Sequence, residues 1–226
     1  MEQFFGVLQQ TELFENMSRE EIRSMLSCLG YHERVYPKNN IIWNTGDIVR
    51  SFGIVLDGQA QVLRDDLFGK RNIIAYIMPG GVFGEAFACA GLPESPVSVM
   101  AGQTATRVLF LNVEKVLTLC SHACTFHNAL IARLVRMLAR KNIALNEKID
   151  FLGKRTTREK IGAFLLSSYR RQKSNPFLIE FNRNELADFL SVDRSALSRE
   201  LSAMKRAGLI DYWKNSFKIL DFQKME

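Results

Sequence analysis

Residues 181–205 (FNRNELADFLSVDRSALSRELSAMK) constrain the fold of this chain more than any other stretch. They are predicted to form two short helices joined by a tight turn. In the second helix, three apolar side chains recur at i, i+4 and i+7 and must be buried: Leu197, Leu201 and Met204. The other side of its first turn and a half carries Arg194, Ser195, Ser198 and Arg199. Arginine and serine side chains that point outward from a helix N-terminus bind guanine edges and phosphates in the DNA major groove. The stretch therefore predicts a DNA-binding helix-turn-helix.

The residues around these two helices support the same interpretation. Asn182 followed by Glu185 resembles a capping box that opens the first helix. Asp193 is expected to cap the second helix, and Gly208 is expected to end it. Ser191 lies in the turn and would be mildly strained there if its φ is positive.

Two further elements are expected to complete the C-terminal domain. Thr157 can cap a helix that runs through REKIGAFLLSSYRRQ. The alternation in LIDYWKNSFKIL, with Asn215-Ser216 at its centre, predicts a two-stranded wing.

Charge is unevenly distributed along the chain, whose net charge is +6. Residues 1–132 hold 10 Lys and Arg against 13 Asp and Glu, a net −3, whereas residues 133–226 hold 20 against 11, a net +9. A basic half joined to a mildly acidic half is typical of a polyanion-binding module attached to a part with another task. An ordinary solvated basic surface would carry the same charge. The helix-turn-helix favours double-stranded DNA as the partner.

Composition excludes several classes of protein. The 226 residues, 47% hydrophobic and 24% charged, suffice for two domains with separate cores. No run of about 18 apolar residues is present, so we expect no membrane span. The N-terminal segment carries acidic residues and no basic region, so we expect no signal peptide and a cytoplasmic location. The four cysteines, none in a CxxC pair, are then expected to be thiols.

Glycine separates the two halves of the chain more sharply than charge does. Eleven of the fourteen glycines precede residue 103, and between residues 32 and 112 they punctuate short β-rich runs such as SFGIVLDGQAQVLRDD. Short strands separated by closely spaced turns indicate an antiparallel sandwich or roll.

A long helix without proline is predicted for residues 125–152. Two series of residues recur there every seven positions: the apolar Ile131, Leu138, Leu145 and Leu152, and a second series of Val135, Asn142 and Ile149. A seven-residue repeat with one polar asparagine is typical of a two-stranded coiled coil whose register a buried amide pair sets. The alternative is a long helix packed against its own roll. We expect a homodimer, because paired helix-turn-helix units need two-fold symmetry to reach adjacent half-sites.

In this order of elements the chain resembles the CRP/FNR family of bacterial transcription regulators over nearly its whole length. The resemblance is carried by Ile42-x3-Gly46-Asp47, Val55-x2-Gly58, Gly81-Val82-Phe83-Gly84-Glu85 and LSRELSAMKRAGLI at 197–210. It implies an α+β protein with an effector-sensing, jelly-roll-like β-roll at 1–124, a dimerisation helix at 125–152 and a winged helix-turn-helix at 153–226. It further implies a homodimer that acts on inverted-repeat promoter sites, contacts RNA polymerase and responds to a small-molecule effector.

The effector pocket that the resemblance implies departs from the cyclic-nucleotide-binding members of this fold. In those members an arginine and a small hydroxyl residue follow the Gly-Glu pair and clamp the cyclic phosphate. Alignment of TATRVLFL to the closing strand puts Pro96 and Val97 at these two positions. A phosphate there would lack its bidentate cation, a loss of about 2–5 kcal/mol. We therefore expect an apolar or weakly polar organic effector, not cyclic AMP, and no required cofactor.

The complete set of implied pocket residues is Phe83, Gly84, Glu85, Pro96, Val97, Leu145 and Asn146. Leu145 and Asn146 stand close to the long-helix positions that would meet a purine, where two hydroxyl residues would be expected. Glu85 has two interpretations. It is either a structural carboxylate that accepts backbone N–H groups within the roll, or an acceptor for an effector's hydroxyl or amine.

Metal binding has one candidate set. The iron–sulfur branch of the family uses closely spaced N-terminal cysteines, and only Cys28 is available in that region, which excludes such a cluster. Cys120, Cys124 and His127 would share one helix face and could converge on a metal or sense redox state. Cysteine and histidine also pack as small core groups where a helix meets a roll, and no fourth ligand is evident.

The resemblance also assigns roles within the helix-turn-helix. The family's Ser-Arg pair, Ser198-Arg199 here, places the guanidinium on a guanine edge, and such bidentate contact contributes about 1–3 kcal/mol of base discrimination. Arg194 and Ser195 would reach neighbouring bases or phosphates. The start of the first helix would face phosphate through Arg183 and Asn184.

Two other functional classes compete with a regulator. An enzyme or channel subunit regulated through the same roll is disfavoured, because residues 113–226 contain no Ser/His/Asp set, no paired catalytic carboxylates and no GxxxxGK loop. We therefore expect no enzymatic activity. A nucleoid-type DNA binder with an unliganded roll is the other alternative, and it would protect no defined palindrome.

Overall fold

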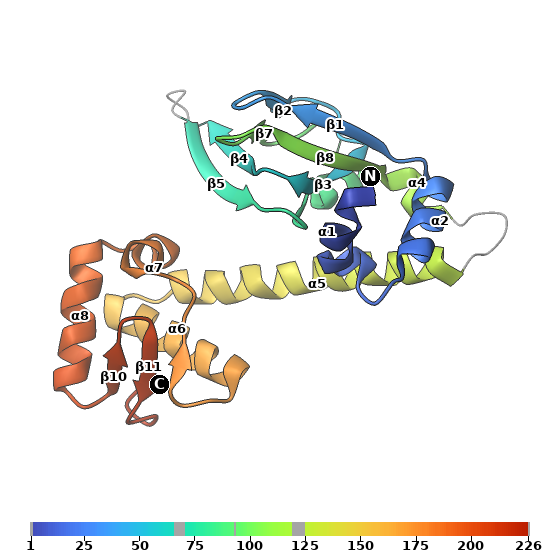
Figure 1. Cartoon of the computed structure of the whole chain (residues 1–226). Coiled ribbons are helices and arrows are strands. Elements are labelled where there is room, and N and C mark those ends of the chain that lie inside the picture. The colour runs from blue at the N-terminus through green and yellow to red at the C-terminus, as the bar shows by residue number, and fades with distance from the viewer. Residues whose placement is uncertain (1, 66–70, 93, 119–124, 226) are drawn as a thin grey trace. The chain divides into compact units, whose positions relative to one another are not determined.

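The computed structural model describes residues 2–65, 71–92, 94–118 and 125–225 (Figure 1). The chain forms two compact units, Met1–Ala139 and Arg140–Glu226, and the boundary between them falls within a single long helix. The architecture is α+β, with antiparallel sheets in the first unit and a winged helix-turn-helix in the second. This confirms the predicted fold class.

Short helices begin the first unit. They are η1 (Glu2–Phe4), α1 (Phe5–Gln10), η2 (Glu12–Phe14) and α2 (Arg19–Leu29). At the start of α2, the Ser18 hydroxyl accepts the Glu21 N–H at 3.2 Å and the Glu21 carboxylate accepts the Ser18 N–H at 2.7 Å. This reciprocal capping box satisfies two N–H groups that the helix itself leaves unpaired.

In the described part of the first unit, eight strands form two four-stranded antiparallel sheets. The strands are β1 (His32–Tyr36), β2 (Ile41–Trp43), β3 (Ser51–Asp57), β4 (Ala60–Asp65), β5 (Arg71–Ile77), β6 (Val82–Phe83), β7 (Ser98–Ala101) and β8 (Thr106–Asn112). Their spatial orders are β1-β8-β3-β6 and β2-β7-β4-β5. Two short helices, α3 (Glu85–Cys89) and α4 (Val113–Leu117), connect strands or follow them. The glycine-punctuated runs thus form the antiparallel roll that they predicted.

The central strand β3 is buried on both faces. Phe52 and Ile54 pack with the N-terminal helices in one core cluster. Val55 points to the interior of the roll and joins a second cluster with Trp43 and Phe83. Because successive side chains of a strand alternate between faces, one apolar strand serves two cores.

Helix α5 (Thr125–Leu152) belongs to both units. Its first turns supply Leu130, Leu134 and Met137 to the core that the N-terminal helices share with β3. Among the described residues, no helix combines the length and the apolar character that a membrane crossing requires.

The second unit contains three further helices around a three-stranded sheet. Its elements are α6 (Thr157–Gln172), β9 (Phe177–Leu178), α7 (Arg183–Leu190), α8 (Arg194–Arg206), β10 (Ile210–Trp213) and β11 (Ser216–Ile219). The strand order is β10-β11-β9. One core cluster contains residues from all three helices and from the sheet, among them Phe164, Leu186, Leu201 and Phe217.

Two boundary predictions in this unit were wrong by one residue. Thr156, not Thr157, caps α6, because its hydroxyl accepts the Glu159 N–H at 3.2 Å in a capping box. The wing turns at Lys214-Asn215 rather than at Asn215-Ser216. Ser216 pairs with Trp213 in the ladder, and the left-handed φ of 51° at Lys214 makes the turn.

Candidate nucleic-acid interface and effector site

Helices α7 and α8 have the connection expected of a helix-turn-helix. The Asn182 side chain accepts the N–H groups of Asn184 and Glu185 at 2.9 and 3.1 Å, and Glu185 accepts the Asn182 N–H at 2.7 Å. This confirms the predicted capping box. Ser191 ends α7 with a φ of 50°, the left-handed turn conformation that favours glycine.

The prediction for the C-terminal end of α8 is confirmed, whereas the prediction for its N-terminal end is only partly so. Asp193 is the N-cap residue, as predicted by its position. Its side chain makes no capping hydrogen bond, so the prediction that this carboxylate caps the helix is wrong. The first N–H groups of α8 therefore lack an acceptor from this carboxylate. Gly208, with a φ of 72°, follows the helix end at Arg206 and Ala207, as predicted.

The two faces of α8 separate as the apolar spacing predicts. Leu197, Leu201 and Met204 are almost fully buried. On the other side, Arg194, Ser195 and Arg199 are exposed and Ser198 is half-buried. An ion pair between Arg158 of α6 and Glu200 also connects α8 to α6, beside the core contacts between these helices. The first turns of α8 thus carry two exposed guanidinium groups and an exposed hydroxyl, while the opposite face of the helix packs in the domain core.

Arg183 occupies a position that sequence reasoning missed. Its guanidinium lies over the rings of Tyr212 and Phe217, at 5.1 and 5.0 Å from their centroids, and donates a hydrogen bond to the Lys214 carbonyl at 2.9 Å. Burial lowers the pKa of Arg183 from its ordinary value. The side chain expected to face phosphate is thus directed at the wing, while Asn184 beside it is exposed.

The predicted dimer residues of α5 differ in burial within this single chain. Val135, Leu145 and Ile149 are 58%, 61% and 64% exposed, and Asn142 is exposed beside them. Ile131, Leu138 and Leu152 are half-buried. Leu138 also packs partly against the core of the first unit.

Aromatic rings fill the interior of the roll next to the Phe-Gly-Glu segment. The Phe83 ring lies 5.0 Å from that of Trp43 and 6.4 Å from that of Phe110. Gly84 has a φ of 79°, and a Cβ there would lie 2.4 Å from the Trp43 ring. A Cβ on Gly53 would lie 2.3 Å from the Phe83 ring. Both glycines are therefore required by the close approach of these rings.

The other predicted pocket residues lie in different environments. Glu85 is 4% exposed in the first turn of α3, and Cys89 shares this short helix. Burial, and secondarily the Glu85 charge, raises the pKa of the Cys89 thiol. At the two phosphate-clamp positions, Pro96 is exposed and Val97 is a buried apolar side chain. Leu145 and Asn146 belong to the second unit, so their share in this pocket stays a prediction.

The candidate metal ligands are only partly described. Cys120 and Cys124 lie outside the described residues. His127 is 2% exposed, and its Nε2 lies 2.7 Å from the Val116 carbonyl, an acceptor, so Nε2 is the protonated nitrogen. Within the described ranges, no three His, Cys, Asp or Glu side chains gather into a metal site.

Two family profiles match this chain. Residues 33–123 match a cyclic nucleotide-binding domain, and residues 159–226 match a Crp-like helix-turn-helix domain. These ranges correspond to the roll and to the winged unit.

Several characterised relatives align over most of the chain. The Cyclic AMP receptor protein of Thermus thermophilus is 28% identical over 198 residues, which cover 88% of this chain and 87% of that protein. The transcriptional activator protein FnrL of Cereibacter sphaeroides is 26% identical over 200 residues, which cover 82% and 74%.

Solved structures show the same fold. The catabolite activator protein of Thermus thermophilus superposes with a TM-score of 0.53 at 24% identity and covers 95% of this chain and 96% of its own. A CooA mutant from Carboxydothermus hydrogenoformans reaches a TM-score of 0.55 at 18% identity, with 93% and 90% covered.

Proposed function

The chain belongs to the CRP/FNR family of DNA-binding transcription regulators, and we propose that it acts as a homodimer on inverted-repeat promoter sites under the control of a small-molecule effector. The observation that carries the proposal is the exposed face of α8. Arg194 and Arg199 project from a helix whose opposite face is locked into the domain core. A rigid helix with outward guanidinium groups has the shape and the hydrogen-bond donors that major-groove recognition requires.

The wing supports the same proposal. Arg183 ties the strands β10 and β11 to the start of α7. The wing is thereby held as part of the same rigid unit as α8. Because the wing and α8 belong to one unit, the position of the wing restricts the orientations in which α8 can enter the major groove.

Homodimerisation through α5 rests on its exposed apolar residues. Val135, Leu145 and Ile149 are more than half exposed in the single chain, and Asn142 lies in register with them. Large apolar side chains at seven-residue spacing are stabilised when a second helix covers them. Two copies of α8 would then be related by a two-fold axis, which an inverted-repeat site matches.

The effector is proposed to be an organic molecule other than cyclic AMP. The Thermus thermophilus relative is named for cyclic AMP, but here Pro96 and Val97 offer no cation at the clamp positions. The rings of Trp43 and Phe83 lie in contact inside the roll. An apolar ligand that displaces these rings would meet an apolar surround, in which a charged cyclic phosphate without a cation would be costly to bury.

Other parts of the proposal follow from family membership alone. We expect contact with RNA polymerase, a cytoplasmic location and no enzymatic activity. A metal or redox response through Cys120, Cys124 and His127 stays open as an alternative mode of control.

A nucleoid-type DNA binder is the second candidate function. The ring contacts that fill the roll favour it, because a roll that needs no ligand would leave DNA binding unregulated.

Selection of bound duplexes from a random library, followed by footprinting at moderate salt, separates the two. A regulator should recover an inverted repeat whose half-site centres are about 34 Å apart. Protection without a recurrent sequence would support the nucleoid-type function and overturn the regulator.

A further inference from the structure

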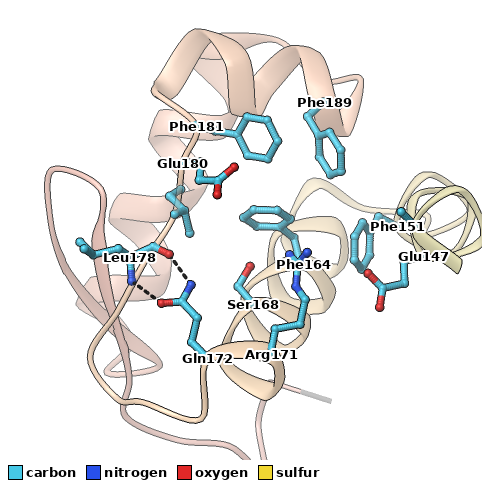
Figure 2. A pocket seen from close by; sticks show the side chains of 12 residues that line it. Glu147, Phe151, Phe164, Ser168, Arg171, Gln172, Leu178, Glu180, Phe181 and Phe189 are labelled. Atoms are coloured by element: carbon cyan, nitrogen blue, oxygen red, sulfur yellow. Dashed lines mark hydrogen bonds between the residues drawn. The ribbon is translucent and has the colours of Figure 1, made fainter. Parts of the chain in front are cut away.

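A pocket of about 360 Å³ lies within the second unit, between the end of α5, helices α6 and α7, and the segment that begins with β9 (Figure 2). This volume falls within the range of small-molecule sites. The residues that line it come from four separate stretches of the second unit, and neither the DNA-facing side of α8 nor the roll contributes to it. It is thus distinct from both sites described above.

Four phenylalanine rings form the apolar wall of the pocket. Phe164 contacts Phe151 and Phe189 at centroid distances of 6.0 and 5.7 Å, and Phe181 stacks on Phe189 at 4.8 Å. Phe151 and Phe164 are buried, whereas Phe181 and Phe189 are half-buried. The rings therefore continue from the core to the opening of the pocket.

The hydroxyl group of the buried Ser168 lies beside the phenylalanine wall of the pocket. Ser168 follows Phe164 by one helical turn, is 3% exposed and points toward the pocket in Figure 2. Its hydroxyl is a hydrogen-bond donor and acceptor in the wall of the pocket. A ligand in the pocket can therefore hydrogen-bond to this hydroxyl.

The residues that line the pocket include two acidic side chains and one basic side chain. Glu147 of α5 and Glu180 contribute two carboxylates, and Arg171 contributes one guanidinium. No ion pair joins these three side chains within the described ranges. Lys148 does not line the pocket, but its Nζ lies 5.1 Å from the Phe189 centroid, so this ring cluster already contacts one ammonium.

We propose that this pocket binds a small organic ammonium ion with an aromatic body. The aromatic body packs on the phenylalanine wall, while the ammonium lies against ring faces and carboxylates, the combination that attracts organic cations in other proteins. Glu147 is the principal counter-ion, because it is the less exposed of the two carboxylates. A ligand there contacts α5, α6 and α7 together and so restrains the first helix of the DNA-binding motif.

The test uses the full-length protein and two probes of equal ring and similar chain length but opposite charge, phenethylamine and 3-phenylpropionate. Ligand-observed saturation-transfer NMR titrations measure both without DNA. We expect phenethylamine to bind and 3-phenylpropionate to bind at least about fivefold more weakly. Glu147→Gln should weaken phenethylamine binding about threefold, since one partly exposed charge contact is lost.

Two further variants separate the pocket from general effects of charge or folding. Asp150→Asn removes a carboxylate three residues along the same helix, outside this pocket, and should leave the affinity for phenethylamine unchanged. Ser168→Leu fills the base of the pocket and should abolish binding, with the fold checked by circular dichroism.

Three outcomes would overturn the proposal: no binding of phenethylamine to the native chain, equal binding of the two probes, or an unchanged affinity in Glu147→Gln. Because no DNA is present in these titrations, their failure leaves the proposed regulator function untouched, and loss of operator recognition would leave this pocket untouched.

Discussion

The guanidinium carbon of Arg183 lies 5.0 Å from the centroid of the Phe217 ring, which joins the first residue of α7 to the second strand of the wing. Tyr212 lies on the neighbouring strand and contacts the same guanidinium at 5.1 Å. The Lys214 carbonyl accepts a hydrogen bond from it at the tip of the wing. A charge that would ordinarily be free to meet phosphate is therefore used to hold the wing against the helix-turn-helix.

Arg183→Lys tests this role, because lysine keeps the charge but loses the planar group that stacks on two rings. We expect the free energy of unfolding of the second unit to fall by about 1–2 kcal/mol, from the lost cation–π contacts and the lost hydrogen bond. Thermal and urea denaturation measure this. An unchanged stability, with a normal salt dependence of DNA binding, would show instead that only the charge matters, as a phosphate contact requires.

Arg199→Ala tests base recognition by α8. Loss of a bidentate contact to a base should cost about 1–3 kcal/mol on the selected operator and flatten preference at one base pair per half-site. Titrations on operator and scrambled duplexes measure both effects. Arg206→Ala, in the last turn of the same helix, is the matched control and should preserve base preference. An equal loss of affinity on both duplexes in Arg199→Ala would mean that this side chain contacts only the backbone.

Dimerisation through α5 is tested by Val135→Lys combined with Ile149→Lys. Both side chains are largely exposed, so the substitutions disturb no core within the chain, unlike a change at the partly packed Leu138. Buried lysines across a coiled-coil interface should leave a monomer in sedimentation velocity and abolish operator binding. Ile143→Lys, at a residue 60% exposed but on another side of the helix, should still give a dimer. Dimers in the double variant would place the interface elsewhere.

Cyclic AMP is expected not to bind to this protein. Val97 is buried and apolar and Pro96 is exposed, so no cation is available to a phosphate in the roll at these positions. Isothermal calorimetry should detect no heat of binding at concentrations that saturate cyclic-AMP-dependent proteins. A micromolar dissociation constant would contradict the alignment of the clamp positions.

The capping box of α6 predicts an acid sensitivity of the second unit. Hydrogen bonds, chiefly from the Thr156 backbone N–H, lower the pKa of the Glu159 carboxyl from its ordinary value. The stabilisation is therefore complete above the ordinary glutamate pKa of about 4.3, and it is lost as the pH falls through the lower folded value. Glu159→Gln should be less stable than the native chain at neutral pH and should lose less stability on acidification. Asp188→Asn, on the exposed surface of α7, should follow the native curve, and a native-like acid response in Glu159→Gln would refute the assignment.

Local patterns in the sequence determined the order and type of the main elements. The spacing of Leu197, Leu201 and Met204 was enough to orient α8, because a helix places residues three and four apart on one face. Asn182 and Glu185 located the start of α7, since a capping box is made by residues only three positions apart. The glycine-punctuated runs indicated the antiparallel roll for a similar reason, as turns and strand alternation are short-range properties.

Contacts between residues distant in the chain were decided only by the tertiary structure. Nothing near Arg183 in sequence indicates the rings of Tyr212 and Phe217, which follow it by about 30 positions and reach it only when the wing folds back. The contact of Phe83 with Trp43 inside the roll depends in the same way on two strands of different sheets. The pocket beside Phe164 arises where four stretches of the second unit converge. Burial, ring contact and charge at such places depend on packing across the whole domain, whereas caps and periodic faces depend on neighbours within one or two turns.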